Sequence, residues 1–367
     1  MEKTFVQNRI ETGVCVFGRD REIEMQEFLD IMNENFDEKH TCYLNSIETS
    51  FDAENSVGKI SVLSKERGRF EVPLWREATQ SLEQNSGDDA SGHSLMEYPQ
   101  VLDSINRYWG LHSSSKMVFG LVRNGKFLMM GSNRYEAMDQ GDLFYHFRTD
   151  VKDMYPNARF EAGGYSTELT SATYSVPSDE FLTGKFRMAA DASGYPDWML
   201  DGCVGVLTFT TSDTCDASAK VKLSMRLGGT EIPLGIPVSV MHKKGHGGVV
   251  KFEEELHKVS AKAEEQLAAL SKLADVSLDH PNNAALYALK KCGADKVAKK
   301  ACKELEDDLL FMSGDTAFSV YLALCRILQT SQGEKLAEGV KMLLMTKIYG
   351  LMTEDWSKFD KAETVVL

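Results

Sequence analysis

The chain has 367 residues, of which 43% are hydrophobic and 26% are charged, and 55 acidic against 41 basic residues give a formal net charge of −14. This composition excludes a disordered or fibrous protein, and the length favours two domains. No apolar run approaches the roughly 18 residues that cross a bilayer. The first five residues lack the pattern of a signal peptide, so we expect a cytoplasmic protein without a membrane partner.

The cysteines indicate a protein without a disulfide framework. There are seven of them, an odd number, and no two have the CxxC spacing. Secreted domains that depend on disulfides usually carry an even number of cysteines at regular spacings. We therefore expect most of these cysteines to act as small buried hydrophobes.

The first 250 residues alternate between helix and strand patterns. Apolar residues at helical spacing predict helices within 21–36, 73–84, 101–109 and 143–154, and extended patterns predict strands within 5–17, 42–50, 58–64, 159–176 and 203–242. The clearest local signal is Asn124-Gly125, which lies between the apolar runs 117–122 and 127–130. This pair is preferred in two-residue hairpin turns.

After Gly247-Gly248 the apolar residues recur every three or four positions. Phe252, Leu256 and Val259 begin this pattern, which predicts a long amphipathic helix followed by further helices, about five in all. The sequence therefore predicts the α+β class. We expect a domain over 1–250 with a twisted, mostly antiparallel sheet and packed helices, followed by an all-α helical domain over 251–367.

Motifs of the common enzyme classes are missing. The chain holds no P-loop, no Gly-x-Ser-x-Gly elbow and no HExxH. His242 and His246 have a spacing that places metal ligands on one side of a helix, but the glycines near them favour a polar junction loop. We expect no catalytic residue, no metal and no cofactor, and an enzyme with an unfamiliar site stays open.

Hydroxyl side chains follow the apolar strand at 203–209. The run Thr210-Thr211-Ser212-Asp213-Thr214 has two interpretations. Hydroxyls and a carboxylate at a strand end can bind a ligand, or they can close a turn through bonds to the backbone.

Basic side chains gather in and around the predicted strands. Three flank the hairpin, three alternate on one strand and two end the last strand: Arg123, Lys126 and Arg134; Lys220, Lys222 and Arg226; Lys243 and Lys244. If these strands pair, the cations form a stripe near Tyr135 and Tyr165 that follows a single nucleic-acid strand by charge and stacking. A half-exposed sheet shows the same alternation of charge without any ligand, so both interpretations stay open.

Several short segments occur in a characteristic order. They are 132–135 (SNRY), 160–165 (FEAGGY), 210–214 (TTSDT), the junction 242–248 before a long helix, and 316–321 (TAFSVY). This order resembles the phage- and plasmid-borne proteins grouped as domain-of-unknown-function family 932. The resemblance implies a mobile-element setting and a non-secreted protein, but no site residues. In outline such a protein is similar to Rad52-like single-strand annealing proteins, which is an analogy of fold and not of function.

Two functions follow as hypotheses. The first is a non-enzymatic cytoplasmic protein that binds single-stranded nucleic acid in phage or plasmid replication or recombination. A homo-oligomer is an open possibility, because the apolar stripe of the long helix is nearly heptad-spaced. The alternative is an acidic protein that binds a host or phage protein, in host takeover, in defence evasion or in a virion. The charge favours this alternative, since 251–367 holds 16 basic and 19 acidic residues and most of the negative charge lies in 1–250.

Overall fold

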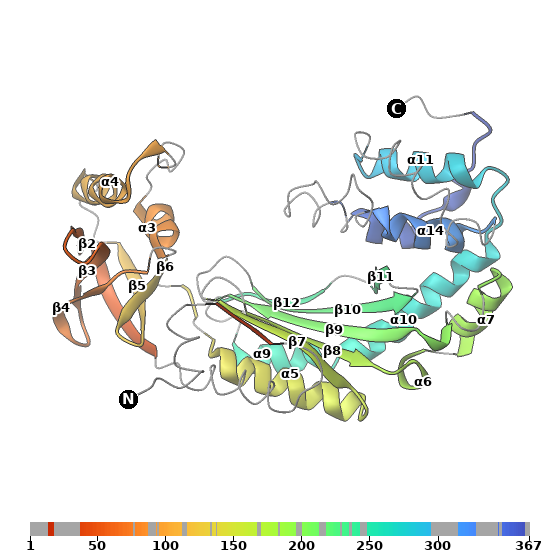
Figure 1. Ribbon diagram of the computed structural model, residues 1–367, viewed down its shortest axis with the longest axis horizontal. Coiled ribbons are helices and arrows are strands. Elements are labelled where there is room, and N and C mark those ends of the chain that lie inside the picture. The colour runs from red at the N-terminus through yellow and green to blue at the C-terminus, as the bar shows by residue number, and fades with distance from the viewer. Residues whose placement is uncertain are drawn as a thin grey trace.

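The computed structural model describes residues 14–17, 37–75, 78–86, 93, 95–111, 116–132, 134–136, 138–166, 170–182, 184–195, 200–212, 218–227, 230–234, 237–242, 248–294, 315–327, 344 and 347–363. These residues form a mixed α+β fold with two antiparallel sheets, which confirms the predicted class in this coarse form. Figure 1 shows a small curled sheet at one end, the second sheet in the middle and the C-terminal helices over its far end.

The curled sheet is a partly closed barrel of five strands. They are β2 (Asp37–Asp52), β3 (Val57–Ser64), β4 (Gly68–Pro73), β5 (Met117–Arg123) and β6 (Lys126–Ser132), in the spatial order β4-β3-β2-β5-β6. Directly after β4, Leu74 forms a parallel bridge with Phe127 of β6, and the Trp75 amide donates to the Phe127 carbonyl at 3.0 Å. This contact joins the two edge strands, so the sheet curls back on itself.

Local sequence explains how the barrel strands turn. Asn124 and Gly125 have φ values of 49° and 76°, which are the left-handed angles of a tight hairpin turn. They join β5 to β6, with Arg123 opposite Lys126, so the predicted hairpin is confirmed. The long strand β2 pairs with β5 over 37–43 and mainly with β3 over 47–52, and its register shifts between Cys42 and Ile47. This irregularity bends β2, which lets one strand serve both sides of the barrel.

Two helices between β4 and β5 complete the barrel core. They are α3 (Ala78–Ser86) and α4 (Tyr98–Leu111). Leu82, Leu102, Ile105 and Trp109 are at most 2% exposed and pack against the inner faces of the strands. The apolar period of 101–109 predicted the helix α4, and the burial of Leu102, Ile105 and Trp109 confirms that prediction.

The second sheet has seven strands. They are β1 (Val14–Phe17), β7 (Arg159–Ser166), β8 (Thr170–Val176), β9 (Val204–Thr211), β10 (Ala219–Leu227), β11 (Thr230–Pro233) and β12 (Val238–Val240). The order is β1-β7-β8-β9-β10-β11, with β12 also paired to β10. On β10, Val221 and Leu223 point inward and are at most 5% exposed, while Lys220 and Lys222 are half-buried on the other face, as the alternation predicted.

Helices from both halves of the chain share one apolar core with this sheet. They are α5 (Gln140–Met154), α6 (Ser178–Phe181), α7 (Gly184–Ala192), α9 (Val249–Leu256), α10 (Val259–Lys272), α11 (Pro281–Lys291) and α14 (Ala317–Cys325). Three short 3₁₀ helices are η2 (Leu273–Asp275), η4 (Leu351–Thr353) and η5 (Trp356–Lys358). Figure 1 shows α5, α9 and α10 beneath the sheet. Buried apolar residues from Met138 to Phe359 form one cluster, so the hydrophobic core continues across residue 250.

Three expectations about elements need correction or fall outside the structure. The helix predicted over 73–84 begins only at Ala78, because Pro73 ends β4, an edge strand that tolerates proline at its last position. The long helix predicted from Phe252 is interrupted at His257 and Lys258, which separate α9 from α10. The helix expected within 21–36 lies outside the described residues.

Two chemical expectations can be compared with the described part of the chain. Cys42, Cys203, Cys292 and Cys325 are buried and free, as predicted for these four. Among the described residues, the helices fall short of the length and apolarity that a membrane crossing needs.

Candidate nucleic-acid interface

The predicted basic residues lie on two different sheets. Arg123 and Lys126 flank the β5–β6 turn of the barrel, whereas Lys220, Lys222 and Arg226 lie on β10 of the second sheet. The Arg123 side chain is only 5% exposed. The Lys126 ammonium lies 4.6 Å from the centre of the Trp75 ring and forms a cation–π contact. The hairpin therefore offers little free positive charge.

Acidic partners neutralise most of the charge on β10. Lys222 pairs with Glu231 of β11 at 2.5 Å, and the Ser224 hydroxyl donates to the same carboxylate at 2.8 Å. Arg226 donates both of its terminal nitrogens to Glu161 of β7, at 3.1 and 3.0 Å. Lys220 makes no ion pair with any residue that the structure describes. Because two of the three cations are already paired, β10 lacks the basic stripe of the nucleic-acid hypothesis.

Arg134 and Tyr135 lie where the barrel meets the second sheet. The Tyr135 ring stacks on His242, with ring centres 5.3 Å apart, and the Glu136 amide donates to the His242 carbonyl. Burial lowers the pKa of His242 to about 4, so its ring is neutral at pH 7. Arg134 is exposed beside this pair. Tyr135 and Arg134 thus lie together beside His242, and Lys243, Lys244 and the Tyr165 side chain lie outside the described residues.

A different group of cations lies together on the outside of the barrel. We call it the basic patch and define it by four cations and two exposed apolar side chains: Lys65, Arg67, Arg69, Lys116, Tyr43 and Leu63. Tyr43 is 41% exposed and Leu63 is 46% exposed. The Lys65 ammonium lies 5.3 Å from the centre of the Tyr43 ring and contacts the Met117 sulfur at 3.5 Å. The β3–β4 turn contributes Lys65 and Arg67, and the first residues of β4 contribute Arg69.

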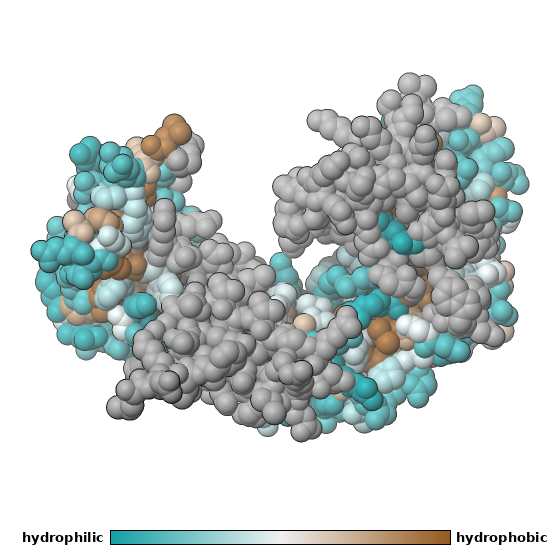
Figure 2. Space-filling model, viewed as in Figure 1, coloured by the Kyte–Doolittle hydropathy of each residue, from teal (hydrophilic) through white to brown (hydrophobic). Residues whose placement is uncertain are grey.

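Nearby acids compensate only part of this charge. Glu38 pairs with Arg67 at 3.3 Å, and Glu66 accepts from the Thr41 amide at 2.8 Å. Lys65, Arg69 and Lys116 form no ion pair within the described part of the chain. The patch therefore holds four cations against these two acids, while Glu48 and Glu71 lie further along the same strand face beside Ser61. Figure 2 shows that hydrophilic side chains cover much of the visible barrel surface, with small hydrophobic areas between them.

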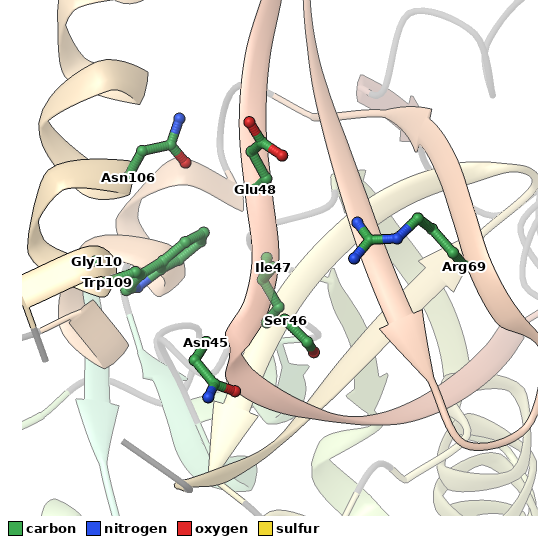
Figure 3. Close-up of a pocket in the computed structure, with 8 residues that line it drawn as sticks. All are labelled: Asn45, Ser46, Ile47, Glu48, Arg69, Asn106, Trp109 and Gly110. Carbon is green, nitrogen blue, oxygen red and sulfur yellow. The ribbon is translucent and has the colours of Figure 1, made fainter. Parts of the chain in front are cut away.

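A pocket of about 410 Å³ adjoins the basic patch where β2 bends. Figure 3 shows its lining side chains, which come from β2, β4 and α4: Asn45, Ser46, Ile47, Glu48, Arg69, Asn106, Trp109 and Gly110. Ser46 links pocket and patch, since its hydroxyl donates to the Tyr43 carbonyl at 2.6 Å. Arg69 belongs to both, and its guanidinium donates to the Ser61 hydroxyl at 3.2 Å.

The Asn106 amide fixes the wall of this pocket. Its oxygen accepts from the Thr49 amide and hydroxyl at 2.8 and 2.9 Å, and its nitrogen donates to the Thr49 carbonyl at 2.6 Å. After its bend, β2 no longer pairs with β5, so the Thr49 backbone needs another partner there. The Asn106 side chain supplies it and ties α4 to the bent strand.

The described residues offer little for metal or hydroxyl chemistry. They contain no cluster of three or more His, Cys, Asp or Glu side chains suited to a metal. His242 is stacked on Tyr135, and His246 lies outside the described residues. Thr211 and Ser212 are fully buried at the end of β9, and the Thr211 hydroxyl has no hydrogen-bond partner among the described residues. Residues 213–217 are not described, so the ligand and the turn interpretations of this segment both stay open.

Sequence reasoning missed the basic patch because its parts look ordinary alone. Alternating basic residues in Lys65–Arg69 resemble any exposed turn, and Lys116 lies 47 positions beyond Arg69. The usable signal was three cations within five residues next to an exposed strand. Comparison of the chain with protein-family models, with curated proteins and with solved structures finds no match.

Proposed function

We propose that the barrel binds single-stranded nucleic acid through the basic patch. The observation that carries this proposal is the connectivity of the barrel together with the charge on one of its faces. The first strand of the barrel, β2, is long and bent, and it pairs with the second strand (β3) and the fourth (β5). Helices follow the third strand (β4), and the chain directly after the third strand meets the fifth strand (β6) in parallel. This is the connectivity of oligonucleotide- and oligosaccharide-binding barrels, which bind such ligands across their second and third strands.

Most of the basic patch lies on these two strands and the turn between them. β3 and β4 are the second and third strands of the barrel, and they carry Leu63, Arg69 and the turn with Lys65 and Arg67. Cations beside an exposed aromatic ring suit a flexible single strand, because phosphates bind the charges and bases stack on the ring. Tyr43 with Lys65 at its side provides this combination.

The overall negative charge is compatible with such a site. Electrostatic binding to nucleic acid depends on the local arrangement of cations and weakens steeply with salt. On an acidic chain, a basic patch attracts the phosphate groups that an acidic surface repels. The resemblance to the phage- and plasmid-borne family supports a role in replication or recombination in a bacterial cytoplasm, as a monomer or homo-oligomer.

Fluorescence polarisation of a labelled 20-nucleotide oligothymidylate at low salt tests this proposal. We expect binding that the triple variant K65A/R67A/R69A weakens at least tenfold. The matched control is K258A/K262A/K272A, which removes three exposed lysines elsewhere and should bind like the parent. Equal binding by both triple variants contradicts the proposal, as does the absence of binding by the parent at micromolar concentration.

A protein partner is the second candidate, and one observation favours it. Tyr145 of α5 is 60% exposed and Val250 of α9 is 70% exposed, on two helices that contact each other. Exposed apolar side chains on neighbouring elements are typical of protein interfaces. Recovery of a host protein from nuclease-treated lysate by the parent but not by Y145S/V250S supports this candidate, and equal recovery by both contradicts it.

A further inference from the structure

The pocket beside the basic patch has features that backbone binding does not need. It is concave, about 410 Å³ in volume, and combines an indole with several polar groups. Sites that bind one small heterocyclic ligand have this character, an apolar wall with a few placed polar groups. Arg69 lies in both the pocket and the patch, so a strand held by the patch passes the mouth of the pocket.

Most polar groups of the lining are already occupied. The Asn106 amide is held by Thr49 through three hydrogen bonds, and the Ser46 hydroxyl donates to the Tyr43 carbonyl. In the described structure, the Asn45 amide and the Glu48 carboxylate have no side-chain hydrogen bond or ion pair. These two side chains are the groups that remain for a ligand.

Trp109 forms the apolar wall. Its side chain is 2% exposed, and its indole nitrogen is buried without a hydrogen-bond partner. Buried polar nitrogen atoms nearly always have a partner in folded proteins, so one without a partner is informative at a binding site. Trp109 therefore closes the inner end of the pocket as part of the barrel core, and its indole nitrogen has no partner among the described residues.

We infer that this pocket takes a single unstacked guanine base of the strand bound at the basic patch. This inference rests on the proposed function. The Glu48 carboxylate only accepts hydrogen bonds and offers two oxygens. Guanine presents two adjacent N–H donors on its pairing edge, its ring N1–H and its exocyclic amino group, which match these oxygens.

The other bases fit a carboxylate less well. Adenine and cytosine each present one amino group next to a ring nitrogen that accepts. Thymine and uracil present one N–H between two carbonyl oxygens, which the carboxylate repels. Asn45 can donate to the guanine carbonyl because its amide carries both a donor and an acceptor. The expected order of preference is guanine, then adenine and cytosine, then thymine.

Binding of four labelled oligonucleotides tests the inference. Each is an oligothymidylate of 13 nucleotides in which the central position is thymine, guanine, adenine or cytosine. We expect the parent to bind the guanine oligonucleotide about tenfold more tightly than the thymine one, the size of one good bidentate base contact. E48Q should lose this preference while still binding the plain oligothymidylate, because glutamine retains only one acceptor oxygen.

Two further measurements separate the possible outcomes. N45A should reduce the guanine preference without abolishing it. This variant still tests the pocket if E48Q fails to fold. K65A/R67A, which leaves the pocket residue Arg69 in place, should weaken all four oligonucleotides alike. Equal binding of all four by the parent overturns the guanine inference and leaves the proposed function standing. Absence of binding to every oligonucleotide overturns both.

Discussion

Replacing Asn106 with alanine should destabilise the barrel by about 2–3 kcal/mol. The side chain makes three hydrogen bonds of 2.6–2.9 Å to Thr49, and a typical hydrogen bond contributes about 0.5–1.5 kcal/mol net. Thr49 is only 3% exposed, so alanine leaves its amide and carbonyl buried without these partners. The cost of unsatisfied buried groups places the effect in the upper part of this range.

Urea unfolding followed by tryptophan fluorescence measures this loss, and amide hydrogen exchange at Thr49 locates it. The barrel contains Trp75 and Trp109, which report on its unfolding. Asp103→Ala is the matched control, because Asp103 is exposed on the same helix and its removal should change the free energy of unfolding by less than about 0.5 kcal/mol. If Asn106→Ala behaves like this control and the Thr49 amide stays protected, Asn106 does not hold the bent strand.

Two further predictions concern the second sheet and its junction with the barrel. Phe209 is fully buried and contacts Phe144, Phe147 and Phe252, so Phe209→Ala should cost about 3–5 kcal/mol in a thermal or urea melt, and a loss below 1 kcal/mol contradicts the described core. Burial lowers the pKa of His242 to about 4 from the 6.5 of an exposed histidine, so the unfolded chain binds its proton first as the pH falls. The stability that the neutral ring contributes is complete above pH 6.5, and the free energy of unfolding should fall by about 3 kcal/mol as the pH falls to 4. His242→Phe should flatten this part of the pH profile, and an unchanged profile contradicts the burial of the ring.

Local patterns predicted local structure well. The hairpin at Asn124-Gly125 follows from two residues that tolerate positive φ. The helix α4 follows from its apolar period, and β10 follows from the alternation that buries Val221 and Leu223. In each case neighbouring residues alone determine the outcome.

Contacts between distant residues were not predictable from these patterns. The barrel closes because Leu74 meets Phe127, 53 positions further along the chain. The continuous core across residue 250 depends on helices that pack onto a sheet formed earlier in the chain. The apolar period of 252–273 continues past His257, so it gave no sign that the helix breaks there.

The candidate site shows the same limit. Lys222 and Arg226 alternate on one strand as a nucleic-acid interface would require, yet strand register places Glu231 and Glu161 beside them. The periodicity of one β-strand shows which face of the sheet a cation occupies. It does not show which side chain of the neighbouring strand lies beside that cation. Only the pairing of the strands distinguishes these neutralised cations from Lys65 and Arg69 of the basic patch, which have no ion pair within the described part of the chain.

The salt dependence of oligonucleotide binding tests the central proposal most directly. For single strands, each phosphate contact contributes about 0.7 to the slope of log affinity against log salt concentration. The parent should therefore show a steep slope, and K65A/R67A/R69A should reduce it by about 2, as expected for three lost contacts. An identical slope for the two proteins would mean that nucleic acid, if bound at all, is bound elsewhere than at the basic patch.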